Sequence, residues 1–464
     1  MASPLMASQV DEGAAGRPAA RGSGPGAIRR VRRWVSDNRF LIFVTLLALA
    51  VRLVWNLRIH PPDDYVFSDM GGYVGRAHRI LGNPFIRHVD EAFFPFGAHY
   101  LLAAVKAIFG KDNGAATGIY QALTGTAVVA MTYAISRRLT GSRWVPRLVG
   151  VIAAFYYPLI SLGGYYLSET PYSFFLTASV LLVLRLADEG RRGDAWLLGV
   201  TIGLGAVVRP QILMGLPFLG LFWLIRRRSF PRLRIGRLWR TAIPLCLILG
   251  MSAARAKYHS GRVSLVAQNG GVNRVFGRCH NVKTESRGGW FGPPPFGALI
   301  EYEKRHPDAW VKLDPAFGLE LKSRGFMWDE AKLDEIADRC IQKTGWLKQA
   351  HYGLNHVILL WGYNTTWPDM GQKRWRMAMR NWNAIHMVAF LPPLLVALGL
   401  GMRRRFARHG LLTMQIFGLM VVSVLYFGDT RFRTPYDPII IVLAMDAYGR
   451  GVSWVMRQIQ RILS

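Results

Sequence analysis

Three carboxylates, Asp63, Asp64 and Asp69, stand just after an apolar segment that is long enough to cross a membrane. Keeping a carboxylate charged beside lipid is costly, so a carboxylate in this position suggests a function. Asp69 has two interpretations. It could cap the helix expected in "MGGYVGRAHRIL", or it could act as a general base toward an acceptor hydroxyl or amine.

Arginines occupy comparable positions further along the chain. Arg431 and Arg433 lie in "YFGDTRFRTPYDP", between two apolar segments, and Arg209 lies within a third apolar stretch. Guanidinium groups bind phosphate through paired hydrogen bonds, so a fixed anion would explain arginines held against lipid. For Arg431 and Arg433 the alternative is a surface network with Asp429 or Asp437. For Arg209 it is a side chain that extends to the outer headgroups.

The composition indicates a membrane protein. The chain has 464 residues, 51% of them hydrophobic, and a formal net charge of +30. The apolar residues fall in blocks of about 15 to 20, the length of a transmembrane helix. Arginine runs abut these blocks, which is typical of cytoplasmic ends and argues against nucleic acid as the partner. These runs are Arg29-Arg30, Arg32-Arg33, Arg137-Arg138, Arg191-Arg192, Arg226-Arg227-Arg228 and Arg403-Arg404-Arg405.

The blocks predict an all-α protein with ten membrane spans and both termini on the cytoplasmic side. In the first outer loop, 59–113, "HYLLAAVKAIFG" is apolar but too short to span, so it predicts a helix along the interface. The expected spans are 40–58, 114–136, 146–163, 171–186, two legs within 195–225, 241–256, 384–401, 411–427 and 438–454.

Residues 195–225 are the least regular of these segments. A single helix of this length would measure about 46 Å, well beyond a hydrocarbon core of about 30 Å. Arginines flank both ends, which places both ends on the cytoplasmic side. The stretch must therefore run out and back, and we expect the turn near Arg209-Pro210, close to the outer edge of the membrane.

Four parts follow from this pattern. Residues 1–28, rich in Ala, Gly, Pro and Ser, are expected to be a disordered cytoplasmic tail. An N-terminal membrane module covers 29–256 and contains the first outer loop. An extracytoplasmic region covers 257–381, and the last membrane helices cover 382–464.

The extracytoplasmic region is polar and contains two of the three cysteines, Cys279 and Cys340. They could form a disulfide outside the cytoplasm or remain two free thiols. A helix is expected in "DEAKLDEIADRCIQKTGWLKQA", with Leu333, Ala337 and Cys340 on its apolar face.

Under this topology the unusual polar residues share one side of the membrane. Asp69, Glu169 at the start of the fourth span, the Arg209 turn, and the Arg431 and Arg433 pair all fall on the outer face. Arginines are normally rare on that side. Their presence favours chemistry at the outer surface of the membrane.

Five motifs in this order resemble those of the membrane-embedded GT-C glycosyltransferases, in particular the bacterial branch similar to protein O-mannosyltransferases and to the lipid A aminoarabinose transferase. The resemblance covers roughly residues 40 to 450. The motifs are "SDMGGYVGRAHRILG", "FPFGAHYLLAAVKAIFG", "YLSETPYSFFL", "GLGAVVRPQILMGLP" and "RFRTPYDPIIIVLA".

The resemblance implies a GT-C type fold with about ten transmembrane helices and interfacial helices in the first outer loop. It also implies an inverting transferase whose donor is a sugar on polyprenyl or dolichyl monophosphate. The acceptor would be a lipid, glycan or protein. The active site would be a cavity at the extracytoplasmic face, in a bacterium the periplasmic face of the inner membrane, and no metal cofactor is expected.

Roles for individual residues follow from the same resemblance. Asp69 would be the catalytic base. Arg431, Arg433 and Arg209 would bind the donor phosphate, and Glu169, Tyr73 and Tyr436 would support the cavity. Many relatives carry an Asp-Glu pair where this chain has Asp69-Met70, so Glu91, later in the same loop, is the second candidate for the base.

Two other functions stay open. A glycan polymerase or ligase would use a lipid-linked donor with a diphosphate in place of a monophosphate. A lipid or solute transporter would be expected to show inverted repeats and polar residues spread through the depth of the membrane. The polar residues of this chain crowd one face, which favours a transferase.

Overall fold

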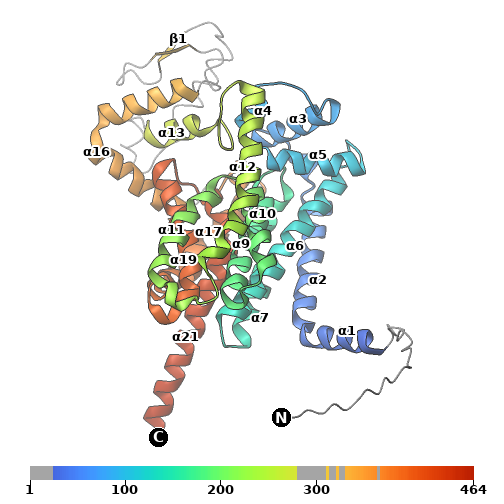
Figure 1. Ribbon diagram of the computed structural model, residues 1–464, viewed down its shortest axis with the longest axis vertical. Helices are drawn as coiled ribbons and strands as arrows, with labels where there is room; N and C mark the ends of the chain where they lie inside the picture. The colour runs from blue at the N-terminus through green and yellow to red at the C-terminus, as the bar shows by residue number, and fades with distance from the viewer. Residues whose placement is uncertain (1–24, 280–309, 313–319, 323–329, 363–365) are drawn as a thin grey trace, which may run out of the picture.

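The computed structural model describes residues 25–279, 310–312, 320–322, 330–362 and 366–464. The described part is almost entirely helical (Figure 1). Long helices run side by side through the middle, and helix α1 (Pro25–Asp37) and the C-terminal end of the chain lie toward the same end of this bundle. The predicted all-α polytopic fold is confirmed; one short pair of strands, β1 (Trp310–Lys312) and β2 (Glu320–Lys322), is added to it.

Five helical segments among the described residues are long and apolar enough to cross a membrane, and a bent pair makes a sixth. The chain is therefore an integral, multi-pass membrane protein. The five are Arg39–Ile59, Glu169–Glu189, Arg376–Gly401, Arg404–Leu425 and Thr430–Leu463. The first consists of α2 (Arg39–Val54) and the π-helical turn Trp55–Ile59, and the second is α9. The third consists of α17 (Arg376–Ile385), the π-helical turn His386–Phe390 and α18 (Leu391–Gly401); the fourth contains α19 (Ala407–Leu425), and the fifth contains α20 (Thr430–Arg433) and α21 (Asp437–Leu463).

The bent pair is the expected third span. It joins α7 (Trp144–Phe155) to α8 (Tyr157–Ser161) and a short 3-10 turn, Leu162–Gly164, at an angle of 48°. Four more helices run alongside the spans in Figure 1, at positions where spans were expected. They are α6 (Gly114–Leu139), α10 (Arg192–Val208), α11 (Gln211–Arg226) and α12 (Leu238–Ser260). The total of ten spans stays a prediction.

The expected break in 195–225 is confirmed. Helix α10 ends at Val208 and α11 begins at Gln211, so Arg209 and Pro210 form the turn between them. Proline at this position cannot donate a backbone hydrogen bond and disfavours a helical conformation for the residue before it. Arg209 accordingly adopts an extended backbone conformation, with φ −151° and ψ 118°.

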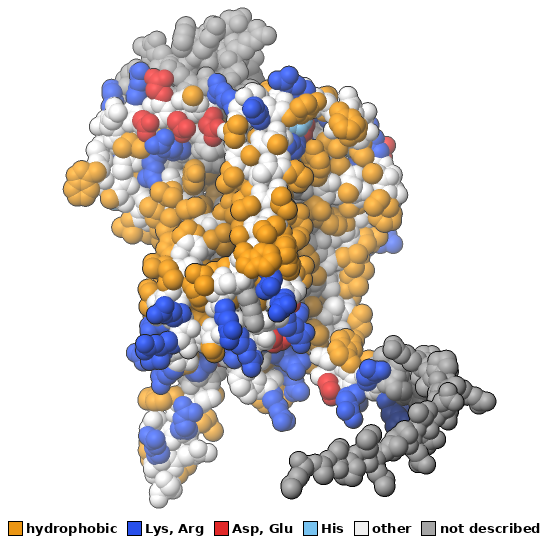
Figure 2. Space-filling view, viewed as in Figure 1, with side chains coloured by type: hydrophobic (Ala, Val, Ile, Leu, Met, Phe, Trp, Pro, Cys, Tyr) orange, Lys and Arg blue, Asp and Glu red, His pale blue; other side chains and the backbone are white. Residues whose placement is uncertain are grey.

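Charge is distributed unequally over the two ends of the bundle. Figure 2 shows hydrophobic side chains around the middle, Lys and Arg at the lower end, and acidic side chains mixed with basic ones near the upper end. The arginine-rich ends of α6 and α11 belong to the lower end. This asymmetry agrees with the orientation that the positive-inside rule predicts.

The first outer loop forms a cap of short helices over the upper end of the bundle. It contains α3 (Asp69–Gly82), α4 (Asp90–Phe93) and α5 (Gly97–Phe109), the predicted interfacial helix. Apolar side chains join α3 and α5 to the segment before α9; they include Met70, Tyr73 and Ala77 of α3, Leu102 of α5, and Leu162 and Tyr165. Burial of these side chains fixes α3, and with it Asp69, against the membrane helices.

The polar region also lies at the upper end. Helix α13 (Gly270–Arg278) packs against α16 (Glu330–Gly362), which contains residues 330–350 of the predicted helix 329–350 and is interrupted at Gly345; residue 329 lies outside the described part. A disulfide joins Cys279 to Cys340 across this contact. The disulfide interpretation of these two cysteines is therefore confirmed, and the two free thiols are not.

Two ends of the fold differ from expectation. Helix α1 (Pro25–Asp37) begins within the predicted tail, so residues 25–28 are helical, and residues 1–24 lie outside the described part. Helix α21 continues to Leu463, beyond the predicted end at 454, and its last turns extend past the bundle in Figure 1. In contrast, its first turns are buried on all sides, with Ile439, Ile440 and Ile441 fully inaccessible.

Candidate active site

Asp69 lies at the start of α3, where the chain has left the upper end of the first expected span, α2. The residue before it, Ser68, has a positive φ of 50°, which is uncommon for a residue other than glycine. No side-chain capping bond forms at this helix start. The capping interpretation of Asp69 is thus not supported, because its carboxylate is directed to another partner.

That partner is Arg431. Nη1 of Arg431 donates to Oδ2 of Asp69 at 3.2 Å. The Asp69 side chain is 36% exposed and the Arg431 side chain 12% exposed. The pair therefore lies at the boundary between the protein interior and the surroundings of the upper end, where a substrate could reach the carboxylate.

Glu169 joins this pair to the α10–α11 turn. It begins α9 and is buried, and its Oε1 accepts hydrogen bonds from Nε of Arg431 and from Nη2 of Arg209, the latter at 2.6 Å. Nε of Arg209 also donates to the hydroxyl of Ser168 at 2.8 Å. Two carboxylates and two guanidinium groups from four distant parts of the chain thus form one connected group, which we name the Asp69–Arg431 cluster: Asp69, Glu169, Arg209 and Arg431.

Each guanidinium of the cluster retains one nitrogen without a hydrogen bond to any described residue. For Arg431 this nitrogen is Nη2, since Nε and Nη1 are engaged by the two carboxylates. For Arg209 it is Nη1, since Nε and Nη2 are engaged by Ser168 and Glu169. Arginine N–H groups are among the strongest donors to phosphate oxygens. The cluster therefore retains donors for an incoming anion.

Aromatic residues surround the cluster. Tyr73 of α3 donates to the hydroxyl of Ser168 at 3.3 Å, and its ring stacks on Phe94. The indole of Trp367 lies 4.4 Å from the Arg431 guanidinium carbon, over which it stacks. Tyr436 lies deeper, with its hydroxyl 2.7 Å from that of Tyr172, one turn below Glu169 on α9.

Arg433 does not join the cluster. Its side chain is fully buried, and its Nε donates to Oδ1 of Asp437 at 3.2 Å. The alternative of pairing with a neighbouring aspartate therefore describes Arg433, whereas Arg431 pairs with Asp69 and Glu169. A role for Arg433 toward the phosphate stays a prediction, and the geometry favours Arg431 and Arg209.

Glu91 belongs to a separate buried group. Its carboxylate accepts from Nε of Arg79 at 3.0 Å and from Nη2 of Arg255 at 3.3 Å, and lies 3.5 Å from Nε2 of His99. Burial raises the pKa of the Glu91 carboxyl, but His99 and Arg79 outweigh this effect and bring it to about 2. No contact joins Glu91 to the cluster among the described residues, so Asp69 is the better placed base.

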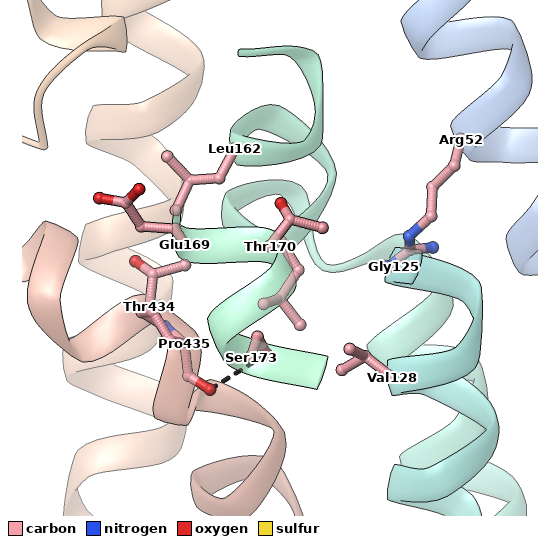
Figure 3. A pocket seen from close by; sticks show the side chains of 10 residues that line it. Arg52, Gly125, Val128, Leu162, Glu169, Thr170, Ser173, Thr434 and Pro435 are labelled. Carbon is pink, nitrogen blue, oxygen red and sulfur yellow. Dashed lines mark hydrogen bonds between the residues drawn. The ribbon is translucent and has the colours of Figure 1, made fainter. Parts of the chain in front are cut away.

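Beneath Glu169 lies a pocket between α2, α6 and α9 (Figure 3). Arg52 borders it opposite Ser173 and Thr434. The Arg52 side chain is buried and donates to the carbonyls of Ala153 and Ala154, the last turn of α7, at 3.2 and 3.1 Å. A cation at this helix terminus satisfies carbonyls that the α7–α8 bend leaves free.

Sequence reasoning missed Ser168, Trp367 and Arg52. Ser168 stands next to Glu169 in "YLSETPYS", so its neighbour was the available signal. Arg52 interrupts an apolar span, which alone indicates a buried partner. No signal identified Trp367, because its contact with Arg431 joins distant segments. No group of three or more potential metal ligands occurs among the described residues, and metal independence stays a prediction.

Comparison with known proteins bears on this architecture. A family model described as dolichyl-phosphate-mannose-protein mannosyltransferase matches residues 94–251, a segment that includes Glu169 and Arg209. The oligosaccharyltransferase of Archaeoglobus fulgidus, solved with a tethered acceptor peptide, is similar at a TM-score of 0.50 and 14% identity. The chain has the GT-C fold. The resemblance to GT-C proteins stated from the sequence is confirmed at the level of the fold, and the family model matches the segment 94–251.

The match to the archaeal structure covers 93% of this GT-C protein but 51% of the archaeal chain, so the protein spans about half the length of that enzyme. ArnT from Cupriavidus metallidurans is similar in two structures. The structure with bound undecaprenyl phosphate has 13% identity and a TM-score of 0.39, covering 90% of this chain and 79% of ArnT. The apo structure has 12% identity and a TM-score of 0.40, covering 89% and 78%. No curated protein matches the sequence.

Proposed function

We propose that this GT-C protein is an inverting glycosyltransferase. It moves a sugar from a polyprenyl monophosphate to an acceptor at the extracytoplasmic face of the membrane, in a bacterium the periplasmic face of the inner membrane. The proposal rests above all on one observation: a half-accessible carboxylate, Asp69, contacts a guanidinium, Arg431, that retains a free donor nitrogen.

Asp69 acts as the base in this mechanism. The acceptor nucleophile attacks the anomeric carbon of the donor from the side opposite the phosphate, and its proton passes to the Asp69 carboxylate. The new bond joins the acceptor atom to the anomeric carbon. The bond between that carbon and the phosphate oxygen breaks, and polyprenyl monophosphate leaves. A single displacement of this kind inverts the anomeric configuration.

Arg431 and Arg209 receive the leaving phosphate. Negative charge grows on the phosphate oxygens as the bond breaks, and donors that are already oriented stabilise this charge without reorganisation. The free Nη2 of Arg431 and Nη1 of Arg209 are such donors. Glu169 keeps both guanidinium groups in place through its Oε1, and Tyr73, Ser168 and Tyr436 support the surrounding wall.

Two further findings support a lipid monophosphate as the donor. The family model that matches residues 94–251 is named for a sugar carried on dolichyl phosphate. Helix α3, whose first residue is Asp69, also lies at the end of the bundle opposite the arginine-rich end. A donor anchored in the outer leaflet presents its phosphate at that level, where Asp69 is accessible.

A transfer assay with purified protein tests the proposal. Candidate donors are polyprenyl monophosphates carrying different hexoses and pentoses, and polyprenyl-diphosphate glycans as the alternative class. Asp69→Asn should lower the transfer rate by about two to four orders of magnitude, the usual contribution of a general base. Asp64→Asn is the matched control, because Asp64 is an exposed carboxylate of the same loop.

The outcomes are distinct. Retained turnover in Asp69→Asn would exclude Asp69 as the base. Transfer from diphosphate donors alone would replace the proposed reaction by that of a polymerase or ligase. Acceptors should include a lipid, a glycan and a peptide, since the sequence and the structure leave the acceptor class open.

A further inference from the structure

A short segment after α16, Thr366–Asp369, is fastened to the helix bundle at both ends. At its start the hydroxyl of Thr366 lies 2.6 Å from that of Thr430, the neighbour of Arg431, and accepts from Nδ2 of Asn383 at 2.9 Å. Thr366 is buried. The start of the segment is therefore held next to the residue that carries the cluster's guanidinium.

The other end is held by Asp369. This carboxylate is fully buried and accepts three hydroxyl hydrogen bonds, from Tyr157 at 2.8 Å, Ser161 at 2.7 Å and Tyr165 at 2.7 Å. No cationic side chain pairs with it among the described residues. Burying a carboxylate costs free energy unless it is hydrogen-bonded, so three converging hydroxyls in helix α8 and the loop after it indicate a specific anchor.

Between these two fastened residues stands Trp367. Its ring lies over the Arg431 guanidinium at 4.4 Å. On another side it meets the ring of Phe67 edge-on at 5.8 Å, two residues before Asp69. The indole thus contacts the Arg431 guanidinium and the segment that directly precedes the proposed base, Asp69.

We propose that Trp367 is a positioning residue for Arg431 and that Asp369 is the anchor that holds Trp367 in place. This inference rests on the proposed function and deepens it, because it assigns to Trp367 the orientation of the phosphate-binding guanidinium. The indole covers one face of the guanidinium and shields that face from water. Arg431 can then bind an anion only through the N–H groups at the edge of its guanidinium, including the free Nη2.

The energetic argument concerns binding of the phosphate. A guanidinium stacked on an indole gains cation–π attraction and loses freedom of rotation. Without the ring, only Glu169 and Asp69 would restrain the guanidinium, its plane could tilt about these two contacts, and the population with Nη2 directed to the phosphate would fall. We expect Trp367→Leu to weaken binding of a lipid phosphate by about tenfold.

The test measures binding of radiolabelled undecaprenyl monophosphate to the purified full chain. Trp367→Leu, Arg431→Gln and the double variant form a cycle. Trp367→Leu should weaken binding by about tenfold in the wild-type background but by less than about twofold in Arg431→Gln, because the ring acts through that guanidinium. Trp367→Phe, which keeps an aromatic face, should retain most of the affinity.

A second measurement addresses the anchor and does not depend on activity. Hydroxyl-radical footprinting reports the accessibility of the Trp367 ring. Asp369→Asn should increase oxidation of Trp367 and weaken lipid phosphate binding. Asp446→Asn is the matched control, because Asp446 is a buried carboxylate of α21 that binds His409 and Arg450 away from the cluster.

Two results would overturn the inference. One is that Trp367→Leu weakens lipid phosphate binding equally in the wild-type and the Arg431→Gln backgrounds, which would indicate a general packing defect. The other is unchanged Trp367 oxidation and unchanged binding in Asp369→Asn. Failure of the proposed function is a different result, namely no sugar transfer by the wild type, and the binding cycle is interpretable in either case.

Discussion

Arg431 and Asp69 are separated by 362 positions in the sequence, and in the structure their side chains meet at 3.2 Å. One belongs to the segment that enters the last span, and the other to the loop that leaves the first. Helices α6 and α7 pack against both α2 and α21 and so join the first expected span to the last. The proposed site therefore exists only once the whole membrane domain has assembled.

Glu169 should be required for the stability of this arrangement. In Glu169→Gln the guanidinium groups of Arg209 and Arg431 remain close together, but the buried negative charge between them is lost. Removing one partner of a buried ion pair typically costs about 3–5 kcal/mol, so the thermal midpoint should fall by several degrees. Undecaprenyl monophosphate should raise the midpoint more in the variant than in the wild type, because the bound anion replaces the missing charge.

A surface pair is the control for this prediction. Glu189 is 26% exposed and pairs with Arg138 at 2.7 Å, and Glu189→Gln should cost less than about 1 kcal/mol. Equal midpoints for Glu169→Gln and the wild type would show that Glu169 does not bridge the two arginines in the membrane.

Arg433 and Asp437 should behave as a structural pair. Both side chains are fully buried, so Arg433→Met should lower the free energy of unfolding by about 3–5 kcal/mol by leaving Asp437 uncompensated. Combining it with Asp437→Leu should restore much of the loss. If instead Arg433→Met abolished undecaprenyl monophosphate binding and left the midpoint unchanged, Arg433 would belong to the phosphate site, as the sequence resemblance implies.

The course of the chain through the membrane could be predicted because helix length and charge placement constrain it directly. The turn at Arg209-Pro210 follows from a segment too long for one span with arginines at both ends. The interfacial helix α5 follows from an apolar stretch too short to span. Both predictions depend on local sequence and membrane thickness. The turn and the helix are confirmed, and the position of α5 along the interface stays a prediction.

The partners of individual side chains could not be predicted in the same way. Arg431 and Arg433 are two positions apart on a short helical segment, so their side chains face different directions. The sequence spacing does not tell which of them faces Asp69. Likewise Glu91 shares a loop with Asp69, but its partner Arg255 comes from α12. Contacts between distant segments decide both cases.

The disulfide should stabilise the polar region. Cys279 and Cys340 join α13 to α16 across 61 residues, and Cys340→Ser should lower the stability of this region by about 2–4 kcal/mol. Limited proteolysis with and without reductant measures the effect. Cys246→Ser is the control, since Cys246 is exposed and unpaired. Titration of three free thiols in the unreduced, denatured protein would contradict the disulfide.

The packing of the first outer loop should weaken in acid through His99. Burial lowers the pKa of His99 to about 4, whereas an exposed histidine titrates near 6.5. Among its neighbours, Glu91 favours the protonated ring, while Arg255 and Arg76 oppose it. As pH falls from about 6.5 to 4, the unfolded chain binds a proton that the folded protein does not, so stability falls across this window.

Thermal midpoints at pH 7.5 and pH 5 measure this dependence. Other buried histidines contribute to the total, so the informative quantity is the difference between variants. His99→Gln should lose less stability on acidification than the wild type, by about 1–3 kcal/mol. His88→Gln, at a histidine of the same loop with a side chain that is 47% exposed, should follow the wild type. If His99→Gln lost as much stability on acidification as the wild type, the His99 ring would be solvated in the folded protein. The contact between Nε2 of His99 in α5 and the Glu91 carboxylate, 3.5 Å in the structure, would then be looser.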